Sequence, residues 1–74
     1  MEEFKIGNIA EVVANHSSGY PEGTTVKIVE HGLWEPWYLT TEILDMDFSH
    51  LDKEEILNHP RVRSHSAREL KLVK

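Results

Sequence analysis

The middle of the chain alternates between apolar and polar positions in a way that predicts two β-strands. Residues 24–30 place Thr24, Val26 and Ile28 on one face and Lys27 on the other, which is the period of two of a half-buried strand. A second alternation follows in residues 37–44, and one side of it comprises Trp37, Leu39, Thr41 and Ile43. His31-Gly32 begins a short connection between the two segments, so we expect them to pair as a hairpin.

Shorter elements flank this hairpin. Gly7-Asn8 is a turn signal before a first strand in residues 9–14, and residues 15–23 form a loop rich in turn-forming residues. Near the other end of the chain we expect a fourth strand in residues 61–64, a single 3₁₀ turn in residues 66–69 and a last strand in residues 70–73.

The segment before the fourth strand carries the start signals of a short helix. Asp52 stands at the N-cap position with Glu55 three residues later, and Leu51 and Ile56 are spaced as a hydrophobic staple. Pro60 cannot continue a helix, because it lacks a backbone donor and its ring clashes with the preceding turn. The helix is therefore limited to about two turns, and a helix that short must dock against the rest of the protein to be stable.

This order of elements predicts a mainly β fold. Several short strands, a long loop after the first strand and a helical turn before the last are typical of a small SH3-like barrel. We expect about five strands, a short helical insert before the fourth strand and a 3₁₀ turn before the last. With 74 residues the chain holds one domain, residues 1–74, in which residues 45–60 form the insert.

The same segments carry the motifs of a known group of proteins. The chain resembles the small SH3-like barrel proteins of bacteria and phages at Gly7-Asn8, residues 15–20, residues 23–30, Trp37-Tyr38-Leu39 and Glu69-Leu70. The resemblance covers roughly half of the chain; it implies the barrel scaffold and a bacterial or phage accessory protein, and it specifies no activity. It does not extend to the insert or to residues 61–64, where the group has an aromatic strand.

Composition indicates the compartment. The chain has no Cys, which excludes disulfides and thiolate metal sites and fits a reducing environment. No stretch approaches the roughly 20 apolar residues of a membrane span, and Met1-Glu2-Glu3 is acidic where a signal peptide is basic. We therefore expect a cytoplasmic protein that does not act on a membrane.

Charge is distributed unevenly along the chain. The net charge is −5, and residues 1–60 hold 3 Lys or Arg and 12 Asp or Glu, whereas residues 61–74 hold 5 and 1. The basic end can neutralise the acidic body by packing beside it, or the two parts can face different partners.

The polar residues lack the spacing of metal sites. None of the five histidines has the His-x-His or His-x-x-x-His spacing of metal ligands; they are His16, His31, His50, His59 and His65. Residues 45–49, Asp-Met-Asp-Phe-Ser, begin like a calcium loop, but His50 occupies the place of the essential glycine and Ile56 that of the bidentate Glu. We expect no metal and no cofactor.

No catalytic arrangement is evident either. Ser64, His65 and Ser66 are adjacent, and neighbours on a strand point to opposite faces, so they do not form a triad. A chain this short has little room for a deep substrate pocket. We expect a protein that is not an enzyme.

Aromatic and acidic residues indicate a protein-binding surface, which is our first hypothesis. Trp34 precedes the alternation of the third strand and is expected to be exposed in a turn, whereas Trp37 points with Leu39, so core packing is favoured for it over contact with a ligand. Acids are concentrated in and beside the insert and suit a basic partner. The residues expected to dock on a larger protein are Tyr20, Trp34, Tyr38, Glu42, Asp45, Asp47, Glu54 and Glu55.

Two alternatives stay open. Small barrels bind nucleic acid through basic loops, and the basic cluster of this chain comprises Arg61, Arg63, Arg68, Lys71 and Lys74, although the acidic body repels phosphate. The other alternative is a self-assembling protein that pairs exposed strand edges.

Overall fold

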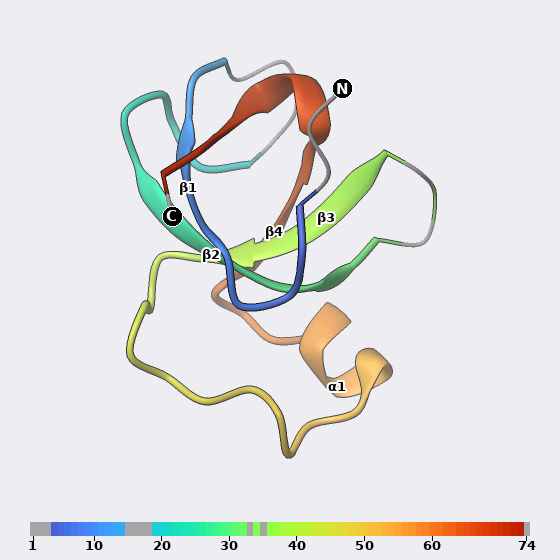
Figure 1. Cartoon of the computed structure of the whole chain (residues 1–74). Helices are drawn as coiled ribbons and strands as arrows, with labels where there is room; N and C mark the ends of the chain where they lie inside the picture. Colours follow the sequence, from blue (N-terminus) through green and yellow to red (C-terminus); the bar gives the residue numbers. More distant parts are fainter. Residues whose placement is uncertain (1–3, 15–18, 33, 35, 74) are drawn as a thin grey trace.

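The computed structural model describes residues 4–14, 19–32, 34 and 36–73. Within these residues the regular elements are five strands, one α-helix and one 3₁₀ helix (Figure 1). In chain order they are β1 (Ile9–Val12), β2 (Thr25–His31), β3 (Trp37–Thr41), α1 (Lys53–Leu57), β4 (Val62–Ser66), η1 (Ala67–Glu69) and β5 (Leu70–Leu72). The predicted mainly β fold and its order of elements are confirmed.

The strands form one antiparallel sheet in the order β4-β3-β2-β1-β5. β2 and β3 pair as the predicted hairpin, with Lys27 opposite Thr41 and His31 opposite Tyr38. The last two strands are not neighbours, because β4 pairs with β3 and β5 pairs with β1. β4 and β5 are therefore the two edges, and η1 connects them. In the described part of the chain the sheet is small and barrel-like but is not closed by pairing of these edges.

The inner face of the sheet encloses one core cluster. It comprises Phe4, Ala10, Val12, Val26, Ile28, Tyr38 and Leu70. The rings of Phe4 and Tyr38 meet edge to face with centroids 5.4 Å apart, a favoured arrangement of aromatic pairs. Tyr38 is 8% exposed, so this residue, which we expected at the binding surface, belongs to the core instead.

A β-bulge in β2 places two consecutive residues on the outer face. The register passes from Ile28 opposite Thr40 to Glu30 opposite Leu39, so Val29 is the extra residue. In a bulge two residues oppose one residue of the partner strand. Val29 faces outward by alternation from Ile28 and joins Leu39 in an outer cluster, and the bulge turns Glu30 to the same face, opposite Leu39.

That outer cluster makes the insert a second layer over the sheet. It comprises Val29, Leu39, Phe48, Ile56 and Val62, with Met46 and Leu51 packed against it. The sheet supplies three of these residues, whereas Phe48 and Ile56 come from the insert, which Figure 1 shows at one side of the sheet together with α1. Burying a large apolar side chain contributes roughly 1.5–3 kcal/mol. The insert therefore stabilises the sheet and is not a free appendage.

α1 begins and ends where the sequence predicts. The Asp52 carboxylate accepts a hydrogen bond from Glu55 N (2.8 Å), and Glu55 Oε1 accepts one from Asp52 N (3.2 Å), so the predicted capping box is confirmed. Ile56 is the buried residue of the helix, and Asn58 caps its end before Pro60.

Several strand ends differ from expectation. The residues expected in strands that lie outside them are 13–14, 24, 42–44 and 73, and β4 begins one residue later than expected and extends to Ser66. At the end of β3 the cause is local, because Thr41 Oγ1 accepts a hydrogen bond from Ile43 N at 3.2 Å. Such side-chain bonds to the backbone compete with the ladder of the sheet.

Candidate functional site

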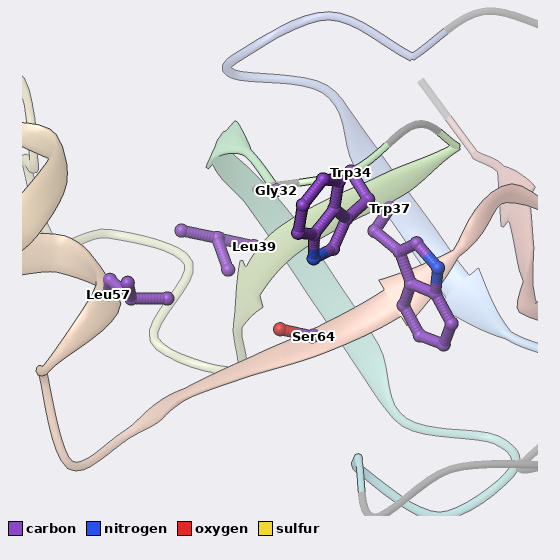
Figure 2. A pocket seen from close by; sticks show the side chains of 6 residues that line it. All are labelled: Gly32, Trp34, Trp37, Leu39, Leu57 and Ser64. Atoms are coloured by element: carbon purple, nitrogen blue, oxygen red, sulfur yellow. The ribbon is translucent and has the colours of Figure 1, made fainter.

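An apolar pocket lies on the outer face of the sheet beside α1. Its volume is about 130 Å³, and it is lined by Gly32, Trp34, Trp37, Leu39, Leu57 and Ser64. Figure 2 shows Leu39 of β3 and Leu57 of α1 pointing toward each other, with the Trp34 ring above β3. An apolar cavity of about 150 Å³ is large enough for a benzene molecule, so this pocket has room for one large apolar side chain.

Trp34 dominates the open side of this pocket. It is 76% exposed, and Leu57 on the opposite side is 37% exposed. Covering contiguous apolar surface is favourable because it removes that surface from water. Trp is also enriched among the residues that contribute most of the binding energy of interfaces. The predicted exposure of Trp34 is confirmed.

Trp37 belongs to the pocket and not to the core. It is only half-buried and lies in neither core cluster, so our expectation of core packing is wrong. By strand alternation it shares the outer face with Leu39, and beyond the insert nothing covers that face in the described residues. Its backbone is held by Gly32, whose N–H donates to Trp37 O at 2.8 Å. A Cβ on Gly32 would lie 2.8 Å from the Trp37 Cβ, so this approach requires glycine.

Carboxylates stand beside the pocket. Glu30 lies opposite Leu39 in the β2–β3 register, and Glu54 lies one helical turn before Leu57 in α1. Lys53 is the cation of α1, and its Nζ lies 3.5 Å from Gly32 O. This contact links the start of α1 to the β2–β3 connection and thereby orients the helix toward the pocket.

Tyr20 lies on the opposite face of β4. Its ring stacks on His65 with centroids 6.0 Å apart, and the Arg63 guanidinium carbon is 5.8 Å from its centroid. His65 lies opposite Tyr38 in the register with β3 and therefore shares the inner face. The expected aromatic set is thus divided, with Trp34 at the pocket, Tyr20 across the sheet from it and Tyr38 in the core.

Some of the acids expected at the surface have local partners. Glu42 forms an ion pair with Arg61. Asp47 Oδ1 accepts a hydrogen bond from Ser49 N at 2.9 Å, and the hydrogen bonds from Ser49 hold the pKa of the Asp47 carboxyl below its usual value. These two carboxylates therefore have partners at the start and in the middle of the loop between β3 and α1.

The other acids divide between the helix cap and open exposure. Glu55 is half of the capping box, so its carboxylate is engaged within the helix. Glu54 and Asp45 are exposed, and their carboxylates make no hydrogen bond or ion pair within the described residues. Glu54 is therefore the candidate acid that stands both free and next to the pocket.

The basic candidates at the start of β4, Arg61 just before it and Arg63 within it, are engaged within the protein. The Arg61 guanidinium is paired with Glu42. Arg63 donates to Pro60 O at 2.8 Å and to Val62 O at 3.1 Å while its guanidinium lies over the Tyr20 ring. The charge of Arg61 is thus partly neutralised by a carboxylate, and the guanidinium of Arg63 is bonded to nearby backbone carbonyls.

The remaining basic candidates lie on other elements. Arg68 is exposed on η1, and Lys71 stands on β5 opposite Glu11 of β1. Lys74 lies outside the described residues. The cluster that is compact in the sequence is therefore spread over three elements, and half of the four described cations have an acid as ion-pair partner or register neighbour.

A hydroxyl and an imidazole are paired beneath Tyr20. Tyr20 N–H donates to His65 Nε2 at 3.0 Å, and Thr40 Oγ1 lies 2.9 Å from His65 Nδ1. Because Nε2 accepts, the ring proton is on Nδ1 and is donated to Thr40, whose hydroxyl donates to Arg63 O at 3.1 Å. Both side chains are completely buried, and burial lowers the pKa of His65. The pair fastens the Tyr20 segment to the sheet and has no surface that a substrate could reach.

The described ranges hold neither a cluster of metal ligands nor a membrane-spanning helix. No three His, Cys, Asp or Glu side chains gather there as metal ligands, and His16 lies outside those ranges. No helix among them is long and apolar enough to cross a membrane.

Sequence reasoning did not assign Gly32, Leu57 or Ser64 to a site. One signal was available, because neighbouring apolar residues on a helix point about 100° apart. When Ile56 docks, Leu57 is displayed beside it. The contribution of Ser64 depends on the register of β4 against β3, which no local pattern specified.

A scan against protein-family models, a search of curated proteins and a search of solved structures found no match. The resemblance to SH3-like barrel proteins is therefore supported as far as a small five-stranded antiparallel fold. Functional interpretation rests on the geometry of the outer face.

Proposed function

We propose that the protein is a non-catalytic binding module that receives a large apolar side chain of a partner protein in the pocket beside α1. The observation that supports it most directly is Trp34, 76% exposed over a pocket whose walls are Trp37, Leu39 and Leu57. A concave apolar site with an aromatic anchor is the common form of a binding hot spot.

The pocket is already arranged before any partner arrives. Gly32 holds the backbone of Trp37, and burial of Ile56 fixes the helix that presents Leu57. Binding then orders few additional groups, which lowers its entropic cost. This arrangement supports the interpretation that the exposed apolar surface is a binding site for a partner.

The surroundings favour a partner with positive charge. Glu54 stands beside the pocket, on the helix that carries Leu57, and the chain as a whole carries −5. Complementary charge mainly accelerates association and selects among partners. The acids of the insert thus act as a selective rim, and the pocket supplies the anchor.

Trp34→Ala tests the pocket directly. Tagged protein is incubated with a nuclease-treated bacterial lysate, and the proteins it retains are quantified by mass spectrometry. We expect Trp34→Ala to reduce retention of the main partner at least about tenfold, since loss of a hot-spot side chain costs about 2 kcal/mol or more. The fold should be unchanged, because the side chain is mostly exposed.

Val73→Ala is the matched control, because Val73 is also apolar and 53% exposed but does not line the pocket. It should retain the same partner as the unaltered protein. Equal retention by all three proteins would contradict the proposed site.

A further inference from the structure

The edge strand β4 has an open position at Ser64. Val62 N–H donates to His59 O at 3.1 Å, and Ser66 N–H donates to Glu69 Oε1 at 2.9 Å. Both donors therefore point away from β3. Backbone groups of residues two apart on a strand point the same way, so the N–H and C=O of Ser64 also face the free edge.

The pairing with β3 agrees with this orientation. Trp37 O accepts its hydrogen bond from Gly32, on the β2 side, so Trp37 and Leu39 direct their backbone groups toward β2. Leu39 is the residue opposite Ser64, which makes this pair a non-hydrogen-bonded one. Ser64 is exposed, and within the described residues its backbone makes no hydrogen bond outside the sheet.

We propose that the partner presents an extended segment that pairs antiparallel with β4 at Ser64, with a large apolar residue opposite Ser64 and basic residues two positions to either side. This inference rests on the proposed function, because it specifies how the apolar side chain reaches the pocket. Addition of a strand to a sheet edge is an established mode of peptide recognition, in which the backbone supplies affinity and alternate side chains supply specificity.

One partner residue meets both the edge and the pocket. Because the backbone groups of Ser64 face the free edge, Ser64 and the partner residue opposite it would form a hydrogen-bonded antiparallel pair. In such a pair the two residues exchange both backbone hydrogen bonds, and their side chains lie on the same face. Ser64 itself lines the pocket. The partner residue opposite Ser64 therefore directs its side chain to the same outer face, next to Trp34 and Leu57.

Charge complementarity specifies the flanking residues. Positions two residues away on an extended segment share the face of the central residue, and the outer face carries Glu54 near the pocket, on the helix that contacts β4. A long basic side chain at one of those positions can approach this carboxylate. The bonds at Val62 and Ser66 occupy the edge on both sides of Ser64, so the paired segment is short.

A synthetic peptide serves as the probe, acetyl-Thr-Lys-Thr-Phe-Thr-Lys-Thr-amide. Binding is followed by the fluorescence of Trp34 and Trp37. We expect saturable binding that weakens at least about tenfold when the central Phe is replaced by Ala or carries an N-methyl group, because these changes remove the anchor and one edge hydrogen bond respectively. Replacement of both Lys by Glu should weaken binding several-fold, and that difference should shrink in high salt.

Ser64→Pro and Ser64→Ala are the matched protein variants. Proline removes the N–H but is tolerated on an edge strand whose N–H faces solvent, whereas alanine keeps the N–H and removes only the hydroxyl. We expect Ser64→Pro to lose at least about tenfold in affinity and Ser64→Ala to stay within about twofold. If circular dichroism shows that Ser64→Pro is misfolded, the N-methyl comparison decides, since it leaves the protein unchanged.

The outcomes separate the pairing from the pocket. Phe-dependent binding that ignores both N-methylation and Ser64→Pro would overturn the strand pairing and leave the proposed pocket intact. Absence of any Phe-dependent response would overturn both. A dimer in light scattering that Ser64→Pro dissociates would assign the edge to a second copy of this chain and overturn the proposed partner.

Discussion

At the scale of single residues, His65 shows how a polar side chain is accommodated in a small core. Its two ring nitrogens meet Tyr20 N–H and the Thr40 hydroxyl, so the neutral ring leaves no polar atom unpaired. A proton on Nε2 would displace the Tyr20 donor. Glu69 carries an opposite charge nearby and the Tyr20 carbonyl lies 3.5 Å from Nε2, but burial outweighs both and lowers the pKa.

This environment predicts a pH-dependent stability. The unfolded chain regains the ordinary His pKa of 6.5, so below that pH it binds more protons than the folded protein. The contribution of neutral His65 to the free energy of unfolding should be fully present above about pH 6.5. It should decrease as the pH drops through that value toward the lower pKa of the folded state. Urea unfolding between about pH 8 and pH 5 measures it.

His65→Gln provides the control, because an amide does not titrate in this range. The variant should be less stable at pH 8 and should show a smaller loss between pH 7 and pH 5. An equal slope in both proteins would show that other groups dominate.

At the scale of elements, two adjacent residues of α1 have different roles: Ile56 contributes to stability, and Leu57 lines the proposed binding pocket. Ile56 is 2% exposed and completes the outer cluster with Val29 and Leu39, whereas Leu57 faces the pocket. The capping box at Asp52 begins the helix, but five helical residues are not stable alone. Docking through Ile56 therefore holds the element that displays Leu57.

We expect Ile56→Ala to lower the free energy of unfolding by about 2–5 kcal/mol, the cost of a cavity in a packed core. Leu57→Ala should lower it by less than about 1 kcal/mol, because the side chain is partly exposed. Urea unfolding measures both changes. Leu57→Ala should nevertheless weaken binding of the Phe peptide at least about threefold by fluorescence titration. A large destabilisation by Leu57→Ala together with unchanged peptide binding would contradict this division.

At the scale of the whole molecule, the charge distribution favours the proposed protein partner over a nucleic acid. The net charge is −5, and the basic residues that are close together in the sequence lie before β4 and on β4, η1 and β5. Arg61 is paired with Glu42. Phosphate binding gains affinity from cations that displace counterions, and here few cations share one open surface.

We therefore expect no retention on a DNA column at about 50 mM salt, where nonspecific binding is strong for basic proteins. The elution volume relative to an acidic protein of similar size is the measurement. Retention that declines with salt and is lost in Arg61→Ala combined with Arg63→Ala would support the nucleic-acid alternative instead.

Local patterns sufficed for much of the fold. The alternation in residues 24–30 marks β2, and the spacing of Asp52, Glu55 and Pro60 marks the start and limit of α1. These features depend on interactions between residues no more than about four positions apart in the sequence, so they can be predicted from the sequence alone. Less of the candidate site was predictable, since Trp34 was expected there but Tyr38 was misplaced and Trp37 was assigned to the core.

By itself, the sequence determined which segments are strands and helix, because side-chain period, capping and proline act locally. Tertiary structure alone decided which face each strand turns to the barrel interior. The docking of Phe48 and Ile56 gave β3 a second buried face, so Tyr38 lies inside and Trp37, on the same face as Leu39, lies outside. The physical reason is that inward and outward are defined only by what packs on each face, and here residues far along the chain cover the second one.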